Sequence, residues 1–240
     1  MNDKLIVAHR GASDIEPENT IGAFARAIEL GADMIELDIR MSRDQIAFVF
    51  HDDNIDGTHI VNLDFSDIRK LGHDRGIIIP TLEEVLRFTS GKIRLNVELK
   101  IKSRESEIAS RVLDYFSHDQ CILSSFHLDS LISLKEFDDR FQVGLIMGKY
   151  KQEESLFGRL SELFPPYRQI ISVADYIIPH WKLLKFGFLT RIHRHKLKIL
   201  VWTVNEPENI SRYLRDPRIS GIITDKTGMA VSIYERMREN

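Results

Sequence analysis

The stretch that decides the fold covers residues 33–52, DMIELDIRMSRDQIAFVFHD. Apolar side chains predict a strand over its first half, and Glu36 and Asp38 are carboxylates within that strand. Strand residues two apart point to the same face, about 6.6–7 Å from each other. Because buried charges must be paired or bound to a metal ion, this pair indicates a functional site. Two solvated acids on an exposed edge strand are the simpler alternative from this stretch alone.

The second half of the stretch predicts a strand that folds back on the first. Residues 46–50, IAFVF, form a short apolar run, and the polar link at 42–45 is typical of a hairpin turn. The run ends in His51 and Asp52. Glu36 and His51 lie about equally far from the turn, so we expect them roughly opposite each other. Two acids and an imidazole would then converge.

The composition is that of an ordinary globular protein, with 240 residues, 43% hydrophobic and 29% charged. The formal net charge of −3 gives no global reason to expect nucleic-acid binding. The one cysteine, Cys121, excludes an internal disulfide and fits a reducing compartment, so we expect a cytoplasmic location. We see no signal peptide at residues 1–8 and no apolar run near the roughly 18 residues of a membrane span. No linker divides the chain, so we expect one domain over residues 1–240. The sequence does not indicate an oligomeric state.

The rest of the chain alternates strands with helices. Apart from the 46–50 strand we predict eight strands, at 4–8, 34–39, 93–100, 121–126, 142–147, 173–178, 198–204 and 221–224. The main helices between them are predicted at 21–28, 81–90, 105–117, 128–137, 153–164, 181–195 and 207–215, and another helix closes the chain. This alternation predicts an α/β fold, a closed (β/α)8 TIM barrel with a β-hairpin excursion after the second barrel strand. An open doubly wound sheet is the alternative.

The active site of such a barrel lies at the C-terminal ends of its strands. Residues 93–100 alternate apolar and polar side chains, typical of a half-exposed strand, so Glu98 and Lys100 share a face. The unusual polar residues of the chain are predicted at these strand ends: His9, Arg10, Glu36, Asp38, Glu98, Lys100, Ser125, Trp202, Thr224 and Asp225. Charge at this end of the barrel indicates a site.

Three of these residues, Glu36, Asp38 and Glu98, are carboxylates from two predicted strands. Hard oxygen ligands suit Mg²⁺ or Ca²⁺. Arg10 and Lys100 beside them restore a positive potential, which suits an anionic group such as phosphate. Plain ion pairing of the two cations with the acids is the alternative, and both interpretations can hold in the free protein.

His9 and His51 are the candidates for acid/base catalysis, because histidine titrates near neutral pH. Hydrolysis of a phosphodiester needs a proton removed from the nucleophile and a proton given to the leaving alkoxide. Asp52 is interpreted as an orienting partner of His51. Trp202 and Phe126 are either a wall against the organic part of a substrate or simple packing.

Together these residues resemble the glycerophosphodiester phosphodiesterase family. The matching motifs run in family order: HRG (9–11), PENT (17–20), GADMIELDIR (31–40), HDD (51–53), IPTLEEVL (79–86), VELK (97–100), SSF (124–126), VWTVN (201–205) and GIITD (221–225). The resemblance implies a (β/α)8 barrel, a divalent metal, and hydrolysis of glycerophosphodiesters to glycerol 3-phosphate and an alcohol. It also implies metal binding by the three carboxylates, acid/base catalysis by the two histidines, and phosphate contacts by the two cations.

The chain departs from the family pattern in places. Gly57 stands where family members often have arginine, and the segment 71–80 is short. Thr227 stands in place of the usual proline after the last TD pair. The first two departures lie where the head-group alcohol should be recognised, so we expect an open site and broad specificity.

Two rival functions stay open. One is a lysophospholipase D-type phosphodiesterase acting on lysophospholipids. Because such substrates are lipids, this function would make membrane contact possible. Residues 181–198 carry six Lys and Arg residues and no acid. This pattern is typical of a basic amphipathic helix that lies on an anionic membrane. An outer helix of the barrel with a solvated basic face is the simpler interpretation. The other rival is a barrel that binds a phosphoglycerol group without turning it over. The expected partner is a small-molecule glycerophosphodiester, and nothing indicates a nucleic acid.

Overall fold

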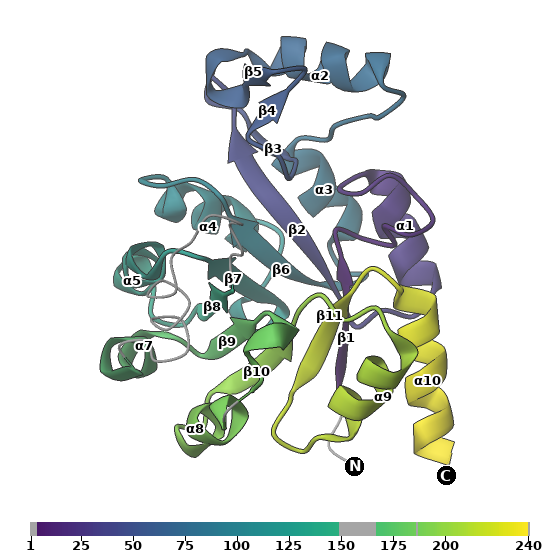
Figure 1. The fold of residues 1–240 in the computed structure, drawn as a ribbon. Coiled ribbons are helices and arrows are strands. Elements are labelled where there is room, and N and C mark those ends of the chain that lie inside the picture. The colour runs from purple at the N-terminus through teal and green to yellow at the C-terminus, as the bar shows by residue number, and fades with distance from the viewer. Residues whose placement is uncertain (1–3, 149–166, 186, 240) are drawn as a thin grey trace.

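A computed structural model describes residues 4–148, 167–185 and 187–239. Its centre is a ring of parallel strands: β1 (Leu5–His9), β2 (Met34–Met41), β6 (Arg94–Leu99), β7 (Cys121–Ser125), β8 (Gln142–Met147), β9 (Tyr176–Pro179), β10 (Lys198–Val201) and β11 (Gly221–Thr224). Strand β1 pairs with both β2 and β11, which closes the ring (Figure 1). The predicted eight-stranded barrel is confirmed, and the open sheet is excluded.

The predicted hairpin is present after the second barrel strand. Strand β3 (Ala47–Val49) pairs antiparallel with β2, with Val49 opposite Ile39. Continuing this register by two residues sets His51 opposite Leu37, one position from the predicted Glu36. The hairpin therefore brings His51 back beside the middle of β2, close to the predicted position opposite Glu36.

Helices surround the ring (Figure 1). They are α1 (Ile21–Glu29), α3 (Leu82–Thr89), α4 (Glu105–Leu113), α5 (Leu128–Phe137), α7 (Tyr167–Val173), α8 (Phe188–Arg194), α9 (Pro207–Arg215) and α10 (Thr227–Glu239). Local signals set their ends: Thr20 caps α1, and Thr81 and Glu84 form a reciprocal capping box on α3. The predicted helix at 153–164 lies outside the described residues.

Residues 181–195 do not form the single helix that we predicted. A 3₁₀ turn, η3 (Trp181–Leu183), is followed by α8, which begins only after Gly187. Gly187 has a φ of 77°, a left-handed conformation that interrupts a right-handed helix. The apolar residues Phe188, Leu189 and Ile192 are buried, so the apolar side of α8 packs inward and its basic side stays exposed.

The prediction of a half-exposed strand at 93–100 is also wrong. Strand β6 is buried from Leu95 to Leu99, and the Asn96 side chain is fully buried. Its alternating polar side chains face the barrel interior and not solvent. Periodicity of two identifies the two faces of a strand but does not say which face meets water.

A small unit projects beyond the end of β2 and β3 (Figure 1). It holds β4 (Asn54–Ile55), β5 (Thr58–His59), a 3₁₀ turn, η1 (Ile60–Asn62), and α2 (Phe65–Asp74). The unit has its own apolar cluster, made by Phe48, Ile55, Ile60, Phe65, Ile68 and Ile79. This cluster anchors the chain on both sides of His51.

The core has an outer and an inner part. The outer part lies between strands and helices and includes Ile35, Leu37 and Ile39 of β2. A separate inner cluster includes Met34 of the same strand. Because side chains alternate along a strand, Glu36 and Asp38 share the inward face with Met34. Within the described ranges, no helix has the length and apolar character needed to cross a membrane.

Candidate active site

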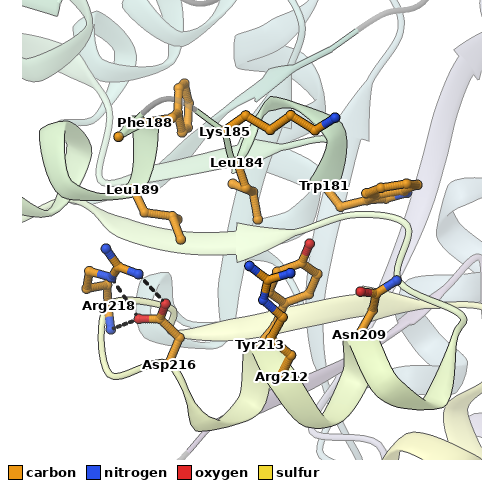
Figure 2. A pocket seen from close by; sticks show the side chains of 11 residues that line it. Trp181, Leu184, Lys185, Phe188, Leu189, Asn209, Arg212, Tyr213, Asp216 and Arg218 are labelled. Atoms are coloured by element: carbon orange, nitrogen blue, oxygen red, sulfur yellow. Dashed lines mark hydrogen bonds and ion pairs between the residues drawn. The ribbon is translucent and has the colours of Figure 1, made fainter.

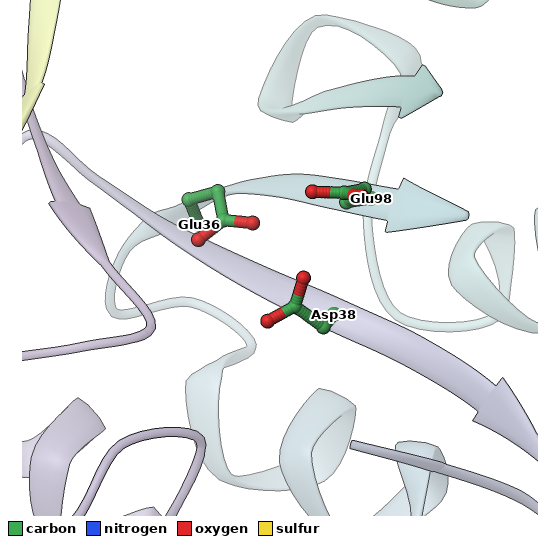
Figure 3. A group of neighbouring side chains, drawn as sticks. All are labelled: Glu36, Asp38 and Glu98. Carbon is green, nitrogen blue, oxygen red and sulfur yellow. The ribbon is translucent and has the colours of Figure 1, made fainter. Parts of the chain in front are cut away.

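Three carboxylates converge at the C-terminal end of the barrel. Glu36 and Asp38 come from β2, and Glu98 lies beside Asp38 in the β2–β6 register. Each offers an oxygen, and these oxygens lie within 4.8 Å of one another (Figure 3). The three residues are only 3%, 0% and 8% exposed. The alternative of solvated acids on an edge strand is therefore excluded.

Two cations and an amide partly compensate this charge. Lys100 Nζ lies 2.7 Å from Glu98 Oε1 and 3.0 Å from Asp38 Oδ1, and Arg10 Nε lies 3.1 Å from Asp38 Oδ2. Asn19 donates a hydrogen bond of 2.8 Å to Asp38 Oδ2. Burial opposes ionisation of Asp38, but Lys100 and Arg10 outweigh it and lower its pKa to about 2.

Glu36 is left short of positive charge. Its burial and the nearby charge of Asp38 raise its pKa to about 8. Asp38 Oδ1 has only the ion pair with Lys100, and both polar atoms of the Asn96 side chain lack a partner in the described structure. Buried carboxylate oxygens whose hydrogen-bonding capacity is not filled suit a hard cation. The donor set therefore fits a divalent ion held by Glu36, Asp38 and Glu98.

His9, at the end of β1, has its own carboxylate partner. Its Nδ1 lies 2.6 Å from Asp225 Oδ1, and its Nε2 lies 4.0 Å from Glu36 Oε2. Asp225 is fixed by hydrogen bonds from Ser13 and from Asn205. Burial alone would lower the pKa of His9, but the bond to Asp225 and the charge of Glu36 outweigh it and raise the pKa.

His51 lies just past β3 and shows the opposite behaviour. Its Nδ1 lies 2.8 Å from Asp52 Oδ1, which supports the predicted orienting role of Asp52. Arg40 clamps the His51 backbone, donating to its carbonyl oxygen from Nε at 2.9 Å and from Nη2 at 2.6 Å. Burial, helped by the charges of Arg10 and Lys100, lowers the pKa of His51 despite the nearby acids. The two imidazoles are thus biased toward opposite protonation states.

One cavity of about 660 Å³ joins these groups. Trp202 and Phe126 also line it, with their ring centroids 5.8 Å apart in an edge-on arrangement. Trp202 is held by its indole nitrogen, which donates to the carbonyl oxygen of Ile178 at 2.9 Å. Both rings also pack against the inner apolar cluster, which confirms packing, and the role of a wall against substrate stays a prediction. All nine predicted site residues except Asp38, which lies beneath, line this cavity.

Sequence reasoning missed the roles of several neighbours. Arg40 follows Glu36 and Asp38 at the same period of two and could have been placed on their face. Asp225 was located at a strand end but given no role, although the β1–β11 register, with Ala8 beside Thr224, brings it next to His9. Asn19 gave no such signal, because it reaches Asp38 through a left-handed backbone conformation with a φ of 59°.

Comparison with known proteins agrees with this geometry. Residues 9–229 match the sequence model of the Glycerophosphoryl diester phosphodiesterase family. The chain is 29% identical to the Glycerophosphodiester phosphodiesterase of Caldanaerobacter subterraneus, over 97% of this chain and 98% of that protein. It is 38% identical to Lysophospholipase D GDPD1 of Homo sapiens, over 91% of this chain and 82% of that protein. A solved glycerophosphodiester phosphodiesterase from Thermotoga maritima superposes with a TM-score of 0.75 at 26% identity, covering 97% of this chain and 99% of that chain. The chain belongs to the glycerophosphoryl diester phosphodiesterase family.

Proposed function

We propose that the protein hydrolyses glycerophosphodiesters to glycerol 3-phosphate and an alcohol, using Mg²⁺ or Ca²⁺. One observation carries the proposal: a buried cluster of three carboxylates shares a cavity with two histidines whose pKa values shift in opposite directions. The family of the chain and the names of its relatives support the same reaction.

Glu36, Asp38 and Glu98 would hold the ion. When bound, a divalent ion neutralises charge that develops on the phosphoryl oxygens. Arg10 and Lys100, which line the cavity beside the acids, would contact the phosphate, since guanidinium and ammonium groups bind phosphate oxygens well. Asn19 and the Lys100 ammonium keep Asp38 oriented.

His9 and His51 would divide the proton transfers. One imidazole accepts the proton of the attacking hydroxyl, and the other donates a proton to the leaving oxygen. Their opposite pKa shifts favour a state with one neutral and one charged ring near neutral pH. Asp225 holds the ring of His9, while Asp52 and the Arg40 clamp hold His51.

A second candidate substrate class is lysophospholipids. The cavity that holds the acids is also lined by Ile146, Ile178 and Ile223, and by the rings of Trp202 and Phe126. This apolar side could accept a hydrocarbon chain. The human relative named Lysophospholipase D supports the same possibility.

We also propose one catalytic domain over residues 1–240, with a small-molecule substrate and a cytoplasmic location. The closed ring, completed by pairing of β1 with β11, supports the single domain because it needs both ends of the chain. The buried free thiol of Cys121 supports a reducing compartment.

An assay of product release tests the proposal. Glycerophosphocholine, glycerophosphoethanolamine and lysophosphatidylcholine would each be incubated with Mg²⁺, Ca²⁺ or EDTA, using the wild type, His51→Ala and the control His59→Ala. His59 is exposed and lies outside the cavity. We expect metal-dependent release of glycerol 3-phosphate that falls roughly 10²–10⁴-fold in His51→Ala only. Turnover of the lysolipid alone selects the second candidate, and metal binding without any turnover would select the non-catalytic barrel.

A further inference from the structure

A second cavity, of about 330 Å³, lies on the outside of the barrel. It separates residues 181–185 and 187–189 from helix α9, whose side chains face them across the gap (Figure 2). Glu36, Asp38, Glu98, His9 and His51 do not line it. The proposed reaction does not use this cavity.

Polar groups without partners line the cavity. Lys185 and Arg212 form no ion pair with any described residue, and Arg212 only stacks on the Tyr213 ring, 5.9 Å from its centroid. The side chain of Asn209 has no hydrogen bond within the described ranges. The Tyr213 side chain is largely buried, but its hydroxyl points across the gap and has no hydrogen-bond partner in the described part of the chain, so it offers one more donor to a ligand.

The one acid that lines this cavity is already neutralised. Asp216 pairs with Arg218 through two side-chain hydrogen bonds, and Arg218 also donates to Thr190 at 3.0 Å. The side-chain bond from Arg218 lowers the pKa of Asp216, which keeps the pair ionised. Two positive charges, on Lys185 and Arg212, therefore remain uncompensated. Their segment adds to this field, because residues 181–198 contain no acid.

The donor set selects the chemistry of a ligand. An arginine fork, an ammonium, an amide and a phenol offer several donors to one small anion, and a phosphate monoester presents three acceptor oxygens and up to two negative charges. Leu184, Phe188 and Leu189 give the cavity an apolar side that can contact the organic part of such an ester. We propose that this cavity, between α9 and residues 181–185 and 187–189, is a binding site for a phosphate monoester group.

Trp181 makes the site observable. It lines the cavity and is one of two tryptophans in the chain, so Trp202→Phe leaves it as the sole tryptophan, whose emission can be excited apart from that of the tyrosines. Phosphates can also bind at Arg10 and Lys100 in the catalytic cavity, and a change of Trp181 fluorescence that depends on Lys185 and Arg212 separates the outer site from that one. The full-length, metal-loaded protein would be titrated with inorganic phosphate, with sn-glycerol 3-phosphate, and with vesicles that contain phosphatidic acid.

Matched variants decide whether the response comes from the proposed donors. Lys185→Ala with Arg212→Ala removes both free cations, and Arg194→Ala with Arg215→Ala removes two exposed cations from α8 and α9 that do not line the cavity. We expect a saturable change of Trp181 fluorescence whose Kd rises at least about tenfold in the first pair and stays within about twofold in the second. Arg212→Lys should keep part of the affinity, because it retains the charge.

The three probes distinguish the source of the phosphate. A response to the small phosphates identifies a soluble ligand, and a response only to the vesicles, with the same dependence on Lys185 and Arg212, identifies a lipid head group. No saturable response to any probe, or equal losses in the two variant pairs, would overturn the proposal. Calorimetric titration with phosphate counts the binding sites independently of fluorescence, on the protein that keeps both tryptophans. We expect the double variant Lys185→Ala, Arg212→Ala to bind one phosphate fewer per chain than the wild type.

Discussion

Replacing Asp225 by asparagine isolates the charge that holds His9. The His9–Asp225 contact is 2.6 Å long, and the carboxylate raises the pKa of His9 against the effect of burial. Asn205 donates to the second oxygen of Asp225, so the oxygen of a new amide would stay with Asn205. The amide nitrogen would then face His9 Nδ1 and force it to accept a hydrogen bond. The variant therefore lowers the pKa of His9 and moves its remaining proton to Nε2.

The structure sets the size of this effect. A hydrogen bond to a charged group contributes about 1.5–3 kcal/mol. The Asp225 side chain is 32% exposed, so solvent screening places the value near the lower end. A loss of about 1.5–2 kcal/mol in the transition state corresponds to a fall in kcat/KM of about 10- to 30-fold.

The assay is a pH–rate profile of glycerol 3-phosphate release, with Asp52→Asn as the control. Asp52 makes the equivalent contact to His51, but its side chain is 63% exposed, and exposed pairs contribute little. In Asp225→Asn the limb governed by His9 should move to lower pH while the other limb stays, and Asp52→Asn should lose less than about threefold. Equal losses in the two variants, or an unmoved limb in Asp225→Asn, would refute this reasoning.

Three further predictions follow from other parts of the structure. Arg40→Lys removes the guanidinium that donates two hydrogen bonds to the His51 carbonyl oxygen, so kcat in steady-state assays should fall about 5- to 10-fold, with a smaller change in KM. The control Arg43→Lys, on the exposed surface, should have no effect, and an unchanged kcat in Arg40→Lys would contradict the role given to Arg40. Gly221→Ala places a Cβ against the Leu5 carbonyl oxygen, between β11 and β1, so urea unfolding should show a loss of stability of more than about 2 kcal/mol. The control Gly22→Ala, whose nearest neighbour would be 3.5 Å away, should change little, and equal stabilities of the two variants would count against this packing. Burial raises the pKa of Cys121 to about 12, so a thiol reagent at pH 8 should label the protein only after unfolding, and fast labelling of the native protein would disprove that burial.

The barrel and most of its site could be predicted because their signals are local. Alternating strands and helices define the ring, and period-two spacing places Glu36 and Asp38 on one face. Capping residues such as Thr20 and Thr81 mark helix starts directly in the sequence. The motifs that carry the family resemblance are themselves short segments, most of them in strands or at strand ends.

The remaining features depend on contacts that join distant segments. His9 and Asp225 lie 216 residues apart and meet only because the first and last strands pair. Residues 93–100 were predicted to form a half-exposed strand because a strand pattern does not tell the barrel interior from solvent. The predicted helix at 181–195 is interrupted where Gly187 adopts a left-handed conformation, a choice that the apolar pattern around it does not reveal.

The central claim is that the ion held by Glu36, Asp38 and Glu98 is required for hydrolysis. The most direct measurement titrates metal-free protein with Mg²⁺ or Ca²⁺ while following both the heat of binding and the release of glycerol 3-phosphate. We predict that activity rises in proportion to occupancy, with one ion per chain, and that Glu98→Gln weakens both together. Full activity in the metal-free protein, or an ion that binds equally well to Glu98→Gln, would contradict it.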